Sequence, residues 1–249
     1  MDPIRAKMLE ALGLVDEAIT DAGQLRAILL CGGQGSGKSY VVKKLMENIY
    51  PQPKVVDSDK LFVKKLQVAN LPQVIPPENA PSPEEKALRT QQLDIRNKAL
   101  ESIKQFLKNY LNGYLPLLID GTGKNYKNMV IRKEKLESLG YDTMIIVVST
   151  SLEVAQERNA KRDRKLPAHG SGSVDEIWKQ VQDNIPKYRQ LFGENCVIVD
   201  NNPGRLDVDY MVEKVNKFFS GTPKNPIGQE LVKSQAATRD VPQADLDTF

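Results

Sequence analysis

Residues 26–39 read RAILLCGGQGSGKS, an apolar run that leads directly into a glycine-rich loop. The loop, Gly32–Ser39, matches the pattern G-x-x-x-x-G-K-S at every position. Its glycines let the backbone approach phosphate groups closely, and its lysine adds a positive point charge. The apolar run predicts a buried strand, and the residues after the loop predict a helix. The loop therefore stands in the strand–loop–helix context that phosphate binding requires.

This loop predicts a site for ATP or GTP. We expect Lys38 to contact the β- and γ-phosphates as a catalytic residue, and Ser39 to ligate Mg²⁺. The plainer reading, a glycine-rich turn with a surface lysine, fits the flanking strand and helix poorly. The expected nucleotide contacts are Gly33, Gly35, Ser36, Gly37, Lys38, Ser39 and Tyr40.

Composition limits the class of protein. The chain has 249 residues, of which 40% are hydrophobic and 27% charged, as in ordinary globular proteins. Two cysteines and a single histidine exclude a disulfide scaffold, a cysteine-rich zinc site and catalysis by a pair of histidines. No apolar run reaches the ~18 residues of a membrane span. The first twenty residues are too charged for a secretory leader, so we expect a soluble cytoplasmic protein without membrane contact.

Positive charge is concentrated in two segments. Overall, 35 Lys and Arg against 32 Asp and Glu leave a net charge of +3, which excludes nucleic-acid binding by bulk charge alone. Residues 124–135 and 158–165, however, each hold five basic residues and one acidic residue. Each segment is either a solvated helix face or the border of a site for a phosphate-bearing partner.

Apolar runs and helical periodicity alternate along the chain, and such alternation predicts a parallel sheet covered by helices. We predict an α/β fold, a three-layer sandwich of the P-loop NTPase type. Its central, mostly parallel five-stranded sheet has helices on both faces. The expected strands are 26–31, 54–57, 115–120, 143–148 and 196–199, and the expected helices are 3–20, 40–50, 83–111, 127–138, 151–164, 174–191 and 207–219.

The chain reads as one domain over residues 1–220. Its core spans 26–200, with the helix at 3–20 packed on it. Five prolines within 71–83 predict an irregular insertion. The polar segment 221–249 has nearly cancelling charges and one aromatic residue, so we expect a disordered tail there.

Two helix starts carry capping signatures. Ser82, Pro83 and Glu85 occupy the cap, first and third positions of the helix that follows the insertion. Ser173 and Glu176 have the same spacing before the helix at 174–191. Both positions predict sharply defined helix starts.

Polar residues follow the second and third expected strands. Because ligands bind beyond the carboxyl ends of strands in such sheets, Asp57 and Asp59 are candidate substrate-binding residues. A carboxylate there accepts the proton of an attacking hydroxyl, helps to hold a metal, or caps the next helix. Asp120 ends an apolar strand, as does the acidic residue that organises Mg²⁺ in P-loop proteins. Thr122 and Lys124, just after it, are further candidates for substrate binding.

The basic segment 158–165 is followed by a Gly- and Ser-rich loop at Gly170–Ser173. Phosphoryl transfer needs positive charge on the moving group, and an arginine there contributes about 10³-fold or more in rate. A lid that closes over the phosphates also excludes water. We therefore expect Arg158 and Arg162 to be catalytic lid arginines; the plainer reading is a solvated basic helix end.

Four elements together resemble a group of P-loop kinases over residues 26–200: GGQGSGKS, VVDSD after the second strand, IDGTGKN after the third and ERNAKRDRKLP in the lid. The chain looks like the kinase domain of phage polynucleotide 5′-hydroxyl kinases and like zeta toxins, which phosphorylate a nucleotide sugar. The resemblance implies that Asp59 is the general base and that Arg158 and Arg162 are the lid arginines.

One position departs from the polynucleotide kinases. An arginine shortly after their base helps to hold the substrate phosphate, and Phe62 stands at that place here. Lys60 and Lys64 are the substitutes that the sequence offers. The departure weakens the case for a polynucleotide end as the substrate.

The sequence thus predicts a phosphotransferase with an alcohol acceptor. It moves the γ-phosphate of ATP or GTP, with Mg²⁺, to a hydroxyl of a nucleic acid, nucleotide or nucleotide sugar. The basic segments favour an acceptor that carries phosphate. Two alternatives stay open: a P-loop ATPase or nucleotide-binding module without an acceptor, and an interaction scaffold.

Overall fold

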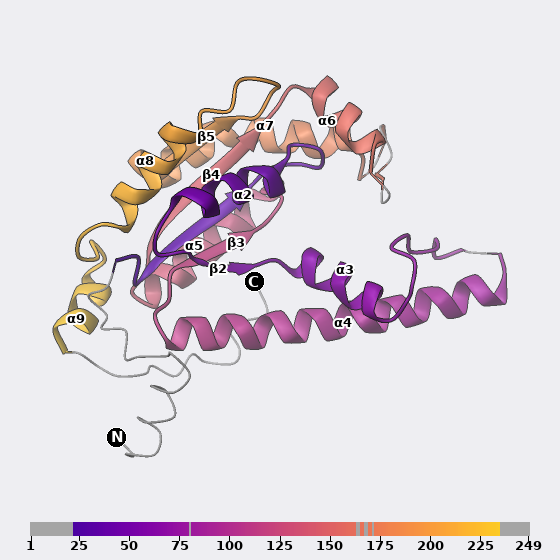
Figure 1. Cartoon of the computed structure of the whole chain (residues 1–249), viewed down its shortest axis with the longest axis horizontal. Helices are drawn as coiled ribbons and strands as arrows, with labels where there is room; N and C mark the ends of the chain where they lie inside the picture. The colour runs from indigo at the N-terminus through magenta and orange to yellow at the C-terminus, as the bar shows by residue number, and fades with distance from the viewer. Residues whose placement is uncertain (1–21, 80, 163–164, 167–168, 171, 235–249) are drawn as a thin grey trace, which may run out of the picture.

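Figure 1 shows the fold in a computed structural model. The structure describes residues 22–79, 81–162, 165–166, 169–170 and 172–234. The helix expected at 3–20 lies outside these ranges. Within them, no helix combines the length and the apolar character needed to cross a membrane.

A five-stranded parallel sheet forms the centre of the molecule. Its strands are β1 (Arg26–Cys31), β2 (Lys54–Val56), β3 (Leu117–Asp120), β4 (Asp142–Ser149) and β5 (Cys196–Asp200). They lie in the order β2-β3-β1-β4-β5, and every neighbouring pair is parallel. β1 has a strand on each side and is buried along its whole length. A strand buried on both faces needs no polar alternation, which explains the apolar run in its sequence. The predicted fold class is confirmed.

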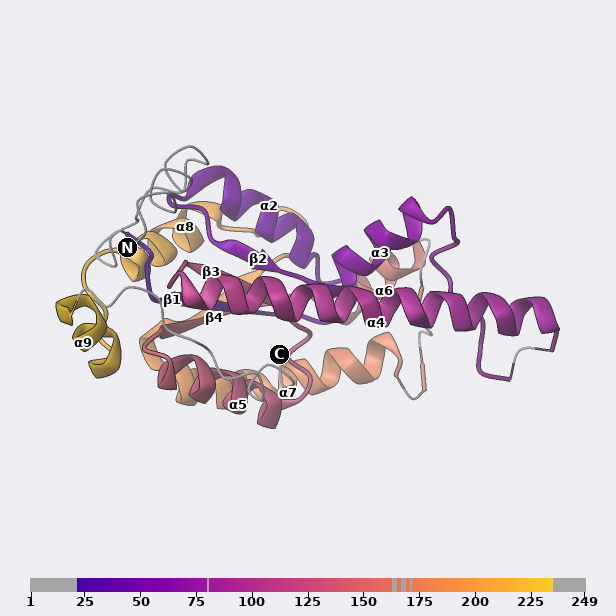
Figure 2. The same cartoon turned by 90° about the horizontal axis from the view of Figure 1, so that it is seen from below.

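Helices cover both faces of the sheet (Figure 2). The covering helices are α2 (Lys38–Asn48), α5 (Tyr126–Ser138), α7 (Val174–Phe192) and α8 (Val208–Phe219). α2 and α8 pack on the face that receives Ile28 and Leu30 of β1. α5 and α7 pack on the opposite face, which receives Leu29 and Cys31. The loop after β1 therefore leaves the sheet at its centre, between two helical layers.

Two further helices form an arm that extends beyond the sheet in both views (Figures 1 and 2). α3 (Ser58–Val68) and α4 (Pro83–Asn112) pack on each other through an apolar cluster around Phe62. The chain between them is irregular, as expected for residues 71–83. Gln92 of α4 donates to two carbonyls of this segment, at 2.6 and 3.1 Å, and so holds it on the arm.

One helix is shorter than expected. α6 spans Leu152–Ala160, whereas the sequence suggested 151–164. Asn159 explains the difference, because its side chain hydrogen-bonds to the backbone of Leu166 and so draws the chain away from the helix axis. Asn159 Nδ2 donates to Leu166 O at 2.9 Å, and Leu166 N donates to Asn159 Oδ1 at 3.1 Å.

The segment expected to be a disordered tail from residue 221 contains a helix, α9 (Pro226–Ser234). The Asp142 carboxylate accepts hydrogen bonds from the backbone N–H groups of Lys224 and Asn225, both at 2.8 Å. The Asn225 side chain in turn caps the start of α9 by accepting from Ile227 N at 2.9 Å. These polar contacts anchor the segment where composition alone predicts disorder, and residues 235–249 lie outside the described part.

Candidate nucleotide and acceptor site

The loop at Gly32–Ser39 presents backbone shaped for an anion. Gly37 caps α2 in the left-handed conformation, with φ 84° and ψ 28°, which favours glycine. No described side chain caps this helix, and its first turn carries no acidic residue. Its first N–H groups therefore face an incoming anion unopposed. Lys38 Nζ donates to Gly32 O at 2.7 Å, which keeps the ammonium on the loop.

Neighbouring elements support this loop. A side-chain carbon on Gly33 would lie 3.8 Å from Cα of Trp178 in α7, and one on Gly35 would collide with the backbone of α6. Asn201, just after β5, donates from Nδ2 to Ser36 O at 2.7 Å. The loop is thus fixed by three elements before any ligand binds, which lowers the entropic cost of binding.

The expected nucleotide contacts differ in exposure. Gly33 and Ser36 are buried, so they offer a ligand little beyond their backbone. Lys38 is half-buried, as are Gly35 and Gly37, whereas Ser39 and Tyr40 are exposed at the start of α2. Hydroxyl and ring contacts are therefore available from Ser39 and Tyr40.

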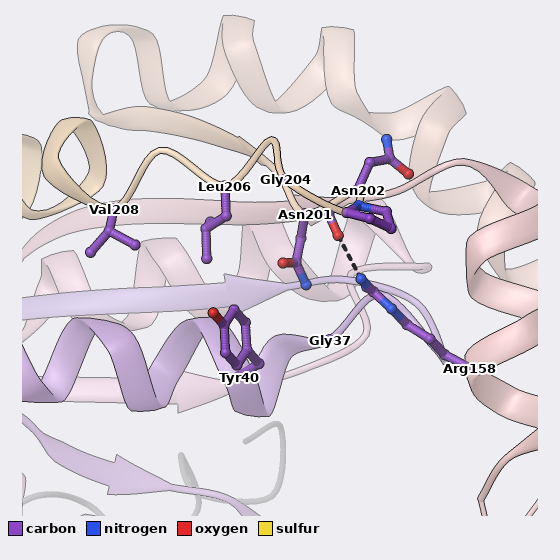
Figure 3. A pocket seen from close by; sticks show the side chains of 9 residues that line it. Gly37, Tyr40, Arg158, Asn201, Asn202, Gly204, Leu206 and Val208 are labelled. Carbon is purple, nitrogen blue, oxygen red and sulfur yellow. Dashed lines mark hydrogen bonds between the residues drawn. The ribbon is translucent and has the colours of Figure 1, made fainter.

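A cavity of about 540 Å³ adjoins the loop. Figure 3 shows Tyr40 of α2 on one side of it and the segment after β5 on the other. Its lining residues are Gly37, Tyr40, Arg158, Asn201, Asn202, Pro203, Gly204, Leu206 and Val208. Apolar walls with a few polar groups are typical of ligand sites, and the cavity begins where the loop ends.

The two expected lid arginines are placed apart. Arg158 lines the cavity, where Nη2 donates to Asn201 O at 2.9 Å (Figure 3) and Nη1 to Ser36 O at 3.4 Å. Arg162 is exposed in the turn after α6. Arg158 thus bridges the loop and the end of β5, while Arg162 points its charge to solvent. Arg162 stands in the sequence between Asn159 and Leu166, which hydrogen-bond to each other.

A carboxylate cluster lies at the ends of β2 and β3. Asp57 caps α3 by accepting from Lys60 N at 2.8 Å, and Asp59 is exposed in the first turn of that helix. Burial raises the pKa of Asp120 from 3.8 to about 6. The nearby Lys38 opposes this rise in pKa, and the charges of Asp57 and Asp59 add to it. The charges of Asp57, Asp59 and Lys38 therefore all act on the carboxyl group of Asp120.

This cluster fits a magnesium ion held jointly with a nucleotide. Asp120 Oδ1 is buried without a hydrogen-bond partner among the described residues. Such an oxygen is costly unless something pairs with it. The Ser39 hydroxyl is exposed at the neighbouring helix start. Within the described ranges no three His, Cys, Asp or Glu side chains gather as a metal site.

The turn after β3 is tied to the phosphate loop. Thr122 O accepts hydrogen bonds from Gly32 N at 3.1 Å and from Cys31 Sγ at 3.4 Å. Tyr188 of α7 donates to Gly123 O at 2.5 Å. The side chains of Thr122 and Lys124 are exposed at this edge. The backbone of the turn is therefore structural, and its side chains are available to a ligand.

Gly123→Ala is expected to destabilise the protein by about 3 kcal/mol. Gly123 has φ +69°, and a Cβ there would collide with Cys31 Sγ. Urea unfolding measures the loss. Gly221→Ala isolates the backbone effect, because Gly221 has φ +76° and nothing within 4 Å of its Cβ position. Cys31→Ala should recover part of the loss when combined with Gly123→Ala. Equal effects of the two glycine substitutions contradict this account.

Asp120→Asn is expected to stabilise the metal-free protein by about 1–3 kcal/mol at pH 8 and by less at pH 5. The wild-type carboxyl has a pKa of about 6 in the folded chain, above its unfolded value near 4. The folded state therefore holds the proton more tightly, and wild-type stability falls as pH rises from about 4 to 6. Urea unfolding with EDTA at both pH values tests this. A gain that does not depend on pH contradicts it.

Sequence reasoning missed three asparagines of this site. Asn201 supports the phosphate loop and follows an expected strand, so its position at a strand end was a usable signal. Asn159 clamps the lid turn, and Asn184 of α7 donates to Gly123 O and Lys124 O at 3.3 and 3.0 Å. Both stand inside helices, where sequence alone carries no sign of a distant backbone partner.

A family model described as an AAA domain matches residues 28–186. A proposed kinase from Chloroflexus aurantiacus is similar in structure, with a TM-score of 0.53 at 15% identity, over 78% of this chain and 98% of that one. A structure from the PezAT chromosomal toxin–antitoxin system of Streptococcus pneumoniae gives a TM-score of 0.50 at 17% identity, over 95% and 98%. At these identities the likeness establishes the fold. No curated protein matches the chain.

Proposed function

The chain belongs to the AAA domain family, and on that premise we propose that it is an ATP-dependent kinase of a hydroxyl group. One observation carries the proposal. An exposed carboxylate, Asp59, stands in the first turn of α3, and its charge raises the pKa of the half-buried Asp120, whereas the charge of Lys38 lowers it. A base that solvent and substrates reach, beside a phosphate loop, suits transfer to a bound hydroxyl.

The proposed reaction is one in-line displacement. Asp59 accepts the proton of the acceptor hydroxyl, and the hydroxyl oxygen forms a bond to the γ-phosphorus. The bond between that phosphorus and the β–γ bridging oxygen breaks, and ADP leaves. The N–H groups of the loop and Lys38 hold the phosphates in line for this exchange. Ser39 and Asp120 would hold Mg²⁺, which when bound offsets the negative charge of the β- and γ-phosphates.

The two arginines receive different proposed roles. Arg158 lines the cavity beside Tyr40, so we assign it to nucleotide binding as well as to the phosphates. Arg162 lies on the short turn that Asn159 clamps, and we assign it to the charge of the moving phosphoryl group when the lid closes. A clamped turn places one cation with less loss of entropy than a long loose lid.

The acceptor we propose is a nucleic acid, a nucleotide or a nucleotide sugar, reached from the edge that carries Asp57, Thr122 and Lys124. The exposure of the Thr122 and Lys124 side chains supports this placement. The resemblance to phage polynucleotide kinases and zeta toxins motivates the substrate classes. Water as the only acceptor, or a chain that merely recruits partners, remains the contrasting outcome of the experiment below.

A transfer screen tests the proposal. The protein is incubated with γ-labelled ATP, Mg²⁺ and separate pools of 5′-hydroxyl oligonucleotides, modified DNA, nucleotides and nucleotide sugars. We expect label on one pool. We also expect nucleotide binding in the same assay to depend on Lys38. Release of inorganic phosphate at a rate that no pool changes would identify an ATPase, and absence of nucleotide binding would leave only a scaffold role.

A further inference from the structure

A half-buried arginine from α5 lies at the end of β3, beside the proposed acceptor edge. If Gly121 carried a Cβ, that atom would lie 3.1 Å from Nη1 of Arg132. The missing side chain of Gly121 therefore makes room for the guanidinium. Gly121 directly follows Asp120, so the guanidinium lies one residue beyond the carboxylate assigned to Mg²⁺.

Arg132 and the phosphate loop approach β3 from opposite sides. Leu118 packs with the α2 layer, and Ile119 packs with the α5 layer. Alternation along the strand places Asp120 toward α2 and Gly121 toward α5, where Arg132 lies. β2, whose end leads to Asp59, is the other neighbour of β3. The guanidinium therefore lies at the end of β3 on the α5 side, next to the turn that carries Thr122 and Lys124.

The guanidinium of Arg132 is partly shielded from water. Burial lowers the pKa of Arg132, and the charge of Asp120 opposes the decrease. Guanidinium groups stay protonated in proteins even so. A planar cation with a fixed fork of donors is suited to two oxygens of a phosphate.

α3, which carries Asp59, has no arginine. Phe62 of α3 is 2% exposed and packs against Leu66 and Ala99. Lys60 and Lys64 are exposed on α3, where water screens their charge. Arg132 of α5, by contrast, is half-buried at the end of β3.

We propose that Arg132 binds a phosphate group of the acceptor and so selects acceptors that carry phosphate near the reacting hydroxyl. The inference rests on the proposed function and names the substrate class of that site. Arg132→Gln should lose this binding, and Arg132→Lys should keep the charge but lose the fork.

A titration with inorganic phosphate tests the site without turnover. The full chain is first saturated with Mg²⁺ and a non-hydrolysable ATP analogue, so that the phosphate loop is occupied. Calorimetry then measures phosphate binding. We expect Arg132→Gln to weaken it at least about tenfold, with Arg132→Lys in between. Lys127→Gln is the matched control, because Lys127 is exposed on the same helix, about 140° around from Arg132. It should bind phosphate as the wild type does.

Each result bears on the inference separately from the transfer screen. Wild-type phosphate affinity in Arg132→Gln, or no binding by the wild type, overturns it. So does an equal loss of affinity for the ATP analogue, since Arg132 would then act by positioning Asp120. If an acceptor is found, Arg132→Gln should raise KM for a phosphate-bearing acceptor about tenfold or more and leave KM for ATP unchanged. A failed screen with Arg132-dependent phosphate binding would refute the kinase proposal alone.

Discussion

Asp59→Asn is expected to lower phosphate transfer by about 10²- to 10⁴-fold while leaving ATP binding intact. The substitution keeps the size of the side chain but removes the base that takes the proton of the acceptor hydroxyl. Asp59 is exposed in the first turn of α3, so little packing changes. Initial rates of transfer and a nucleotide titration measure the two quantities independently.

Asp209→Asn is a closely matched control. Asp207 caps α8 by accepting from Tyr210 N at 2.9 Å, just as Asp57 caps α3. Asp209 therefore occupies the same helical position as Asp59, is also exposed, and loses the same charge. It should transfer phosphate at the wild-type rate. If the two variants behave alike, Asp59 only stabilises a helix terminus and is no base.

Lys38→Ala is expected to abolish measurable transfer and to weaken Mg²⁺–ATP binding by about 10²-fold or more. The substitution removes the point charge from the phosphates. It also removes the cation that lowers the pKa of Asp120, so that carboxyl holds its proton more tightly and serves Mg²⁺ less well. Both effects act in the same direction.

The fluorescence of Trp178 reports this binding. It is the single tryptophan of the chain, and its backbone packs 3.8 Å from the Cβ position of Gly33 in the phosphate loop. Lys43→Ala is the control, because Lys43 is exposed on the same helix and pairs with Glu47 at 4.0 Å. ATP affinity in Lys38→Ala equal to that of the Lys43 control would remove the lysine from the site.

The elements predicted best are those with a short-range physical signature. β1, whose apolar run meets a glycine loop, begins and ends where the sequence places it, at Arg26 and Cys31. The capping box at Ser82 and Glu85 forms with both of its hydrogen bonds. At the start of α7, Ser173 accepts from Glu176 N as predicted, but the Glu176 carboxylate accepts from Gly172 N instead of from the cap residue.

The features that were missed depend on distant partners. α3 was not predicted, because the polar residues after Asp57 resemble a turn. The helix is stabilised by the packing of Phe62 against α4, which the sequence does not show. α6 ends early because Asn159 binds Leu166, and α9 forms because Asp142 and Asn225 anchor it. Periodicity and composition do not predict contacts between residues that are distant in the sequence.

The candidate site divides in the same way. The phosphate loop and the acidic strand ends were predicted, since motif and strand position coincide at both. The cavity next to the phosphate loop was not predicted, because it is formed by Tyr40, Arg158 and the segment after β5, which only the fold brings together. Arg132 appeared in the sequence as one member of a basic segment. Its approach to Gly121 separates it from the rest.

The partition of the γ-phosphate between an acceptor and water tests the central claim most directly. Wild-type protein and Asp59→Asn are incubated with γ-labelled ATP, Mg²⁺ and the pools of hydroxyl compounds, and ADP, inorganic phosphate and labelled ester are counted together. A kinase gives one labelled ester for each ADP formed, in the wild type only. Label found solely as inorganic phosphate, at a rate that neither the acceptors nor Asp59→Asn alters, would contradict the account.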